Sequence, residues 1–202
     1  MRRLIAIHQV SLDGVMQAPG GPEEDPSHRF THGGWAMPYL GDDASEALDG
    51  ILGGPFDLLL GRRTYDIWQG YWPLHEDDPI GAAFAKATKF VVTHRAQGLG
   101  WKESKRVAGD VVEEVRRLKA SKGPDLHLWG SSEVLHLLLG ADLVDEQRLW
   151  VIPVVLGKGK RLFGEDGPAR AMELVSTKRT KTGVLLNTYR RIGPLPPGRP
   201  LK

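Results

Sequence analysis

The sequence contains no cysteine. Disulfide frameworks, thiolate nucleophiles and cysteine-ligated zinc or iron–sulfur centres are therefore excluded, and a redox role requires a borrowed cofactor. Long apolar runs are also missing, because stretches such as Leu58–Leu60 and Val154–Leu156 are far shorter than the roughly 20 residues that cross a bilayer. His8 and Gln9 interrupt the apolar N-terminal run, and no small-residue cleavage site follows. The sequence thus predicts a cytoplasmic protein with no membrane segment.

A large charge of one sign is missing as well. The 202 residues include 27 Lys and Arg against 25 Asp and Glu, a net charge of +2, and the two signs are interleaved. We therefore expect no nucleic-acid partner. The hydrophobic share of 41% and the charged share of 26% are typical of one soluble globular domain, which excludes disordered, collagen-like and coiled-coil classes.

Strand and helix patterns alternate along most of the chain. Short runs rich in branched aliphatic residues predict strands at Leu4–Val10, Phe56–Leu60, Lys89–Thr93, Ser104–Val107, Asp125–Trp129 and Glu146–Val155. Apolar residues at helical spacing predict helices at Ala44–Leu52, Ile80–Ala87, Val111–Ala120 and Ser131–Leu139, with a short helical turn at Tyr65–Trp68. Two late strands, Met172–Lys178 and Val184–Arg190, are close enough to form a hairpin.

This order predicts an α/β fold of three layers, helix, sheet and helix. The central sheet is expected to be mostly parallel, with an antiparallel C-terminal hairpin, and residues 1–192 form one domain. Residues 193–202 are rich in proline and glycine, and we expect them to form a flexible tail.

Residues that follow the strands are the first candidates for a binding site, because ligands of open α/β sheets lie beyond the carboxyl ends of the strands. After the second strand, a glycine, two guanidinium groups and a hydroxyl suit a phosphate cradle: Gly61, Arg62, Arg63 and Thr64. After the third strand, Thr93, His94 and Arg95 suit a second phosphate. The alternative for both segments is an ordinary turn with solvated basic side chains.

The strand ending at Trp129 is followed by Gly130, Ser131 and Ser132 at the start of a helix. Small residues there allow a pyrophosphate to approach the backbone and the positive end of the helix dipole. The alternative is that Ser131 is simply the N-cap.

Other signatures fail. The segment Gly157–Leu162 begins like a dinucleotide fingerprint but has leucine at the third glycine position, and neither a phosphate loop nor a nucleophile elbow occurs. His28 and His32 are spaced for a metal near Asp25, but the surrounding proline and glycine disfavour a helix, so we predict no metal site.

Several motifs, taken in order from Leu4 to about Arg191, resemble the dihydrofolate reductase superfamily. The similarity is greatest to the branch containing the C-terminal reductase domain of the bifunctional riboflavin-biosynthesis enzyme. The motifs that carry it are Ser11–Met16, Leu60–Tyr65, Trp129–Val134, and Asp145 ahead of Ile152–Gly159 with Leu162-Phe163.

This resemblance implies NADPH bound along the carboxyl edge of the sheet. It places Gly61, Arg62, Arg63 and Thr64 at the cofactor phosphates and Thr93, His94 and Arg95 near the adenosine 2′-phosphate. The pyrophosphate would lie above the helix start formed by Gly130, Ser131, Ser132, Glu133 and Val134. The family often has two adjacent glycines where this chain has Gly130-Ser131. A homodimer is also expected, with a subunit contact through Val184–Arg190 and Trp150–Leu156.

The proton donor is less clear. The resemblance points either to the start of the first helix, at Asp42, Asp43 or Glu46, or to Asp13 beside the nicotinamide pocket. For Asp13 the alternative is a turn formed with the glycine that follows it. We expect the long loop 11–38 to close over the ligand with Trp35 and Met37 facing it.

The working hypothesis is an NADPH-dependent reductase acting on a small heterocycle or carbonyl compound, with Asp13, Asp43 or a bound water as the proton donor. An activity like that of 5-amino-6-(5-phosphoribosylamino)uracil reductase is included. The alternative is a non-catalytic nucleotide-binding or ligand-sensing module on the same fold.

Overall fold

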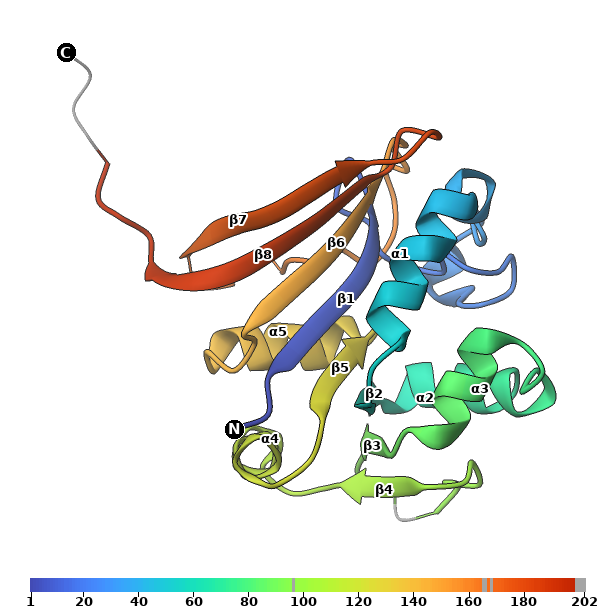
Figure 1. The fold of residues 1–202 in the computed structure, drawn as a ribbon, viewed down its shortest axis with the longest axis vertical. Helices are drawn as coiled ribbons and strands as arrows, with labels where there is room; N and C mark the ends of the chain where they lie inside the picture. The colour runs from blue at the N-terminus through green and yellow to red at the C-terminus, as the bar shows by residue number, and fades with distance from the viewer. Residues whose placement is uncertain (96, 165–166, 168, 199–202) are drawn as a thin grey trace.

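The computed structural model describes residues 1–95, 97–164, 167 and 169–198. An eight-stranded sheet in the order β4-β3-β2-β5-β1-β6-β8-β7 forms its centre (Figure 1). The strands are β1 Leu4–Ser11, β2 Phe56–Gly61, β3 Lys89–Val92, β4 Ser104–Val107, β5 Asp125–Trp129, β6 Glu146–Ile152, β7 Arg170–Arg179 and β8 Leu185–Pro194. The α-helices are α1 Asp42–Leu52, α2 Arg62–Gln69, α3 Pro79–Lys86, α4 Val111–Ala120 and α5 Ser132–Gly140, with short 3-10 turns at Ser27–Arg29, Met37–Tyr39 and Trp72–Leu74.

Strands β4, β3, β2, β5, β1 and β6 run parallel, whereas β8 pairs antiparallel with both β6 and β7. The predicted fold class is therefore confirmed. The hairpin places β7 at the edge of the sheet, so β8 and β6 are interior strands. A subunit contact through Val184–Arg190 and Trp150–Leu156 cannot form by edge pairing, because the ladders on both sides of β8 are already occupied.

Helices cover both faces of the sheet, as Figure 1 shows. On one face, Val115 of α4 and Leu135 of α5 pack in a core with alternate residues of β1 and β5. On the other face, Tyr65 of α2 and Phe84 of α3 pack against Leu58 and Leu60 of β2. A third cluster lies between α1 and the inner face of β6 and β8.

The element boundaries differ most from expectation at three places. Strand β6 ends at Ile152 and not at Val155, because Pro153 has no amide to continue the ladder. The expected turn at Tyr65–Trp68 is a longer helix that begins directly after β2. Strand β8 extends to Pro194, two residues into the predicted tail, and the last four residues of that tail lie outside the described part of the chain.

None of the helices in the described residues combines the length and the apolar character needed to span a bilayer.

Candidate active-site cleft

A cleft of about 640 Å³ opens where the carboxyl ends of the central parallel strands meet. This volume is within the range of small-molecule and cofactor sites. All the residues predicted from sequence to hold the cofactor line it, namely Gly61, Arg62, Arg63, Thr64, Thr93, His94, Arg95, Gly130, Ser131, Ser132, Glu133 and Val134. The structure thus brings together three segments that are far apart in the sequence.

Two helices begin at this cleft. Gly61 is the N-cap of α2 and Ser131 is the N-cap of α5, and no side chain of the described residues caps either helix. The first amides of a helix have no partner within it, and the helix dipole adds positive charge there. Two uncapped helix starts in one cleft favour an anionic ligand.

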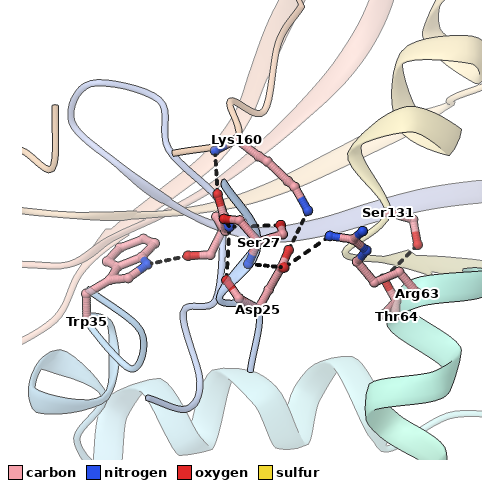
Figure 2. Close-up of polar contacts among 8 residues, drawn as sticks. Asp25, Ser27, Trp35, Arg63, Thr64, Ser131 and Lys160 are labelled. Carbon is pink, nitrogen blue, oxygen red and sulfur yellow. Dashed lines mark hydrogen bonds and ion pairs between the residues drawn. The ribbon is translucent and has the colours of Figure 1, made fainter. Parts of the chain in front are cut away.

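The turn before α5 is left-handed at two successive residues, with φ of 56° at Gly130 and 58° at Ser131. The Ser131 hydroxyl does not cap its own helix. It accepts a hydrogen bond from the Gly61 amide at 2.7 Å and lies 2.9 Å from the Thr64 hydroxyl (Figure 2). A Cβ at Gly130 would lie 2.9 Å from Thr64 Oγ1, so the space there fits glycine alone. Ser131 therefore links the turns that follow β2 and β5.

Each arginine in the cleft has a carboxylate partner. Arg62 Nε donates to both oxygens of Asp66, at 2.8 and 2.9 Å, and its Nη1 donates to the Gln97 carbonyl. The Arg95 side chain is 72% exposed, with Nη1 3.9 Å from Asp66. The Arg63 side chain is 59% exposed, with Nη1 3.1 Å from Asp25. Both exposed guanidinium groups are free to turn toward a ligand.

Sequence reasoning missed the contact between Asp25 and Lys160. Lys160 Nζ donates to Asp25 Oδ2 at 2.5 Å, whereas Arg63 contacts the other carboxylate oxygen, Oδ1 (Figure 2). Burial, the largest single influence, opposes ionisation of Asp25, but the hydrogen bonds from Lys160 and Ser27 and the charge of Lys160 together outweigh it, and the pKa of Asp25 is lowered. The signal was present in the segment Gly157–Leu162, which fails as a dinucleotide fingerprint but supplies a cation to the same cleft.

Gln17 fixes the backbone around this contact. Its Nε2 donates to the carbonyls of Asp25 and Ser27, both at 2.9 Å, and its Oε1 accepts from the Lys160 amide at 3.0 Å. The Trp35 indole in turn donates to the Gln17 carbonyl at 2.8 Å. The side chain of Gln17 is 3% exposed, so it holds two segments together in the interior.

Asp13 and Asp43, the predicted acids, lie outside the cleft as the described residues define it. Asp13 accepts from the Ser11 hydroxyl and from the amides of Leu156 and Gly157, and these bonds, that of Ser11 above all, lower its pKa to about 2. Asp43 Oδ2 accepts from the Lys181 amide at 2.7 Å. Both carboxylates hold loops in place, and neither is positioned to donate a proton to a ligand in the cleft.

Trp35 and Met37 also differ from expectation. Trp35 is 9% exposed and packs in the core beneath α1, because its indole is held by Gln17. Met37 is 52% exposed, and neither residue belongs to the described lining of the cleft. The loop 11–38 contributes only Met16–Pro19, Glu24 and Asp25 to that lining.

Two tryptophans form an aromatic wall in the cleft. Trp68 and Trp129 both line it, with ring centroids 6.1 Å apart, and Trp68 stacks on Phe84 at 4.7 Å. The Trp129 indole N–H is buried and has no hydrogen-bond partner among the described residues. The wall suits a flat ring.

Two further titratable groups line the cleft. His8 Nε2 donates to the Gly130 carbonyl at 2.9 Å, and burial lowers the pKa of His8 to about 4, which keeps its imidazole neutral near pH 7. Glu24 Oε2 accepts from the amides of Gly20 and Gly21, yet burial raises the pKa of this carboxyl. Glu24 is therefore a more suitable acid for the cleft than either predicted residue.

Sequence comparisons give matches that cover most of the chain. The sequence model of the family "RibD C-terminal domain" matches residues 2–186. The uncharacterized protein YyaP of Bacillus subtilis is 30% identical over 195 residues, covering 93% of this chain and 94% of YyaP.

Solved structures share the fold at lower identity. A provisionally assigned riboflavin biosynthesis protein from Shewanella sp. PV-4 has a TM-score of 0.68 and 21% identity, covering 95% of this chain and 99% of the other. A pyrimidine reductase-like protein from Corynebacterium diphtheriae has a TM-score of 0.60 and 13% identity, with coverage of 95% and 92%. The dihydrofolate reductase of Enterococcus faecalis, solved with NADP(H), has a TM-score of 0.58 and 18% identity, with coverage of 94% and 96%.

Proposed function

The chain belongs to the RibD C-terminal domain family, and from this premise we propose that it is an NADPH-dependent reductase of a small heterocyclic or carbonyl compound. The observation that carries the proposal is the convergence of all the residues predicted to bind the cofactor in one cleft.

The residues in the cleft fit a dinucleotide. Gly130 lies where a Cβ would collide with Thr64, and the starts of α2 and α5 present amides that no described side chain caps. In the proposal, Arg63 and Arg95 neutralise phosphates, and Arg62, held by Asp66, adds a fixed positive charge. NADPH bound there supplies the hydride.

Other residues of the cleft would contact the substrate and supply a proton. Trp68 and Trp129 form the wall against which a flat ring would lie. Reduction of an imine or carbonyl also requires a proton. We assign this role to Glu24, because burial raises its pKa and so keeps a proton available nearer neutral pH.

Binding and turnover are tested separately. Titration with NADPH, followed by tryptophan fluorescence, is expected to give saturable quenching because Trp68 and Trp129 line the cleft. Pyrimidines such as 5-amino-6-(5-phosphoribosylamino)uracil, folates and carbonyl compounds are then screened for oxidation of NADPH. Absence of any NADPH binding would refute the proposal.

The competing function is a non-catalytic nucleotide-binding or ligand-sensing module. It is favoured by one observation, that Asp13 and Asp43 bond to backbone amides away from the cleft. Tight NADPH binding with no oxidation on any of the screened compounds would support this function over the reductase.

A further inference from the structure

One carboxylate lies between two cations in the wall of the cleft. Asp25 accepts from Arg63 Nη1 through Oδ1, at 3.1 Å, and from Lys160 Nζ through Oδ2, at 2.5 Å. The Asp25 side chain is 13% exposed, so solvent screens these contacts only in part. Figure 2 shows the two cations reaching the carboxylate from different segments.

The backbone around these groups is fixed without the ion pairs. The Lys160 amide donates to Gln17 Oε1 and its carbonyl accepts from the Met16 amide, at 3.0 and 2.8 Å. The Asp25 carbonyl accepts from Gln17 Nε2. Arg63 belongs to the first turn of α2. The three side chains can therefore change partners while the chain that carries them stays in place.

Two cations contact Asp25, at a helix start that adds further positive charge. Glu24 is the neighbouring carboxyl, and burial and the charge of Asp25 both raise its pKa, so it offsets these cations less than Asp25 does. A phosphate monoester carries about −1.5 to −2 at pH 7, with several acceptor oxygens, and so matches the two cations better than one carboxylate does.

We propose that Arg63 and Lys160 form an anion subsite for a phosphate group of the ligand, with Asp25 as the internal carboxylate that this phosphate displaces. The inference rests on the proposed function only for the choice of ligand. The phosphate belongs either to the dinucleotide or to a phosphorylated substrate, since both would enter the same cleft. Lys160 is then a binding residue that the family resemblance did not indicate.

The test uses the full chain and two probes, NADPH and inorganic phosphate, with dissociation constants from calorimetry. Asp25→Asn removes the competing charge but keeps an oxygen for the Ser27 amide. This substitution is expected to lower the dissociation constant of at least one probe about tenfold. Lys160→Met is expected to raise the dissociation constant of the same probe about tenfold. Glu23→Gln and Lys158→Met are the matched controls, because they change the same charges on neighbouring exposed residues that do not belong to the described lining of the cleft.

A competition measurement distinguishes the sources of the phosphate. If inorganic phosphate no longer binds at saturating NADPH, the subsite holds a phosphate of the dinucleotide. If inorganic phosphate still binds, the subsite holds the phosphate of a second ligand. Thermal unfolding verifies that each variant is folded, with Asp25→Ser as a second removal of the charge. The subsite is refuted if Asp25→Asn and Lys160→Met leave the dissociation constants of both probes unchanged. It is also refuted if the control substitutions change these constants by the same factor. Failure of wild-type protein to bind NADPH would instead refute the reductase, whatever the phosphate result.

Discussion

Replacement of Gly130 by alanine tests the geometry of the cleft most directly. The residue has φ of 56°, and a Cβ there would lie 2.9 Å from Thr64 Oγ1 and 3.1 Å from its Cγ2. The left-handed conformation costs alanine about 1 kcal/mol. Displacement of Thr64 also breaks its hydroxyl bond to Ser131, worth about 1 kcal/mol. Gly130→Ala should therefore destabilise the protein by about 2 to 3 kcal/mol.

Gly109 provides the matched control. It also lines the cleft and has φ of 84°, but a Cβ there would meet no described atom within 4 Å. Gly109→Ala should cost only the backbone strain, about 1 kcal/mol. The assay is urea unfolding followed by circular dichroism, with a Tm difference of about 2 to 4 °C per kcal/mol as a second readout. Equal destabilisation by the two substitutions would show that the contact with Thr64 has no effect and would refute the reasoning.

The remaining predictions concern pH and the ligand. Burial lowers the pKa of His8 and His127 to about 4 from 6.5, so the unfolded chain binds more protons than the folded chain between these values. The free energy of unfolding should therefore fall as the pH is lowered from 6.5 to 4, by about 3 kcal/mol per histidine. Urea unfolding from pH 7 to pH 4 should show a shallower decline for His127→Phe, and an unchanged decline would contradict the assignment. Glu24→Gln should lower kcat by about 100-fold on the compound that the wild type reduces, while the Kd of NADPH stays within about twofold; an unchanged kcat would exclude Glu24 as the acid. In fluorescence titrations, Arg95→Ala should weaken the binding of NADPH about tenfold and leave the binding of NADH unchanged, because only NADPH carries a 2′-phosphate. An equal loss of affinity for both cofactors would show that Arg95 does not contact the 2′-phosphate.

The parts of the site that sequence reasoning found are those fixed by topology. Arg63, Arg95 and Gly130 each follow a parallel strand, and parallel strands of one sheet end at one edge. Their convergence follows from the element order without knowledge of any side-chain contact. The fold class was predictable for the same reason, since alternating strands and helices leave few other arrangements.

The parts of the site that sequence reasoning missed depend on the path of the long loop 11–38. Asp25 and Lys160 are 135 residues apart, and their contact exists because the buried Gln17 bonds to the backbone of both segments. No periodicity in the sequence indicates such a path. Trp35 was misplaced for the same reason, because its indole turns inward to Gln17. Asp13 was misassigned because a short acidic side chain before glycine suits a turn and an active site equally well.

The hydroxyl of Ser131 has a consequence for the thermodynamics of ligand entry. Its contacts with Gly61 and Thr64 hold the turns that follow β2 and β5 together in the protein without ligand. A ligand that contacts both turns then restricts little additional chain motion, so the loss of conformational entropy on association is small. Affinity in this cleft would depend mainly on the desolvation of charged groups and on the exchange of their partners.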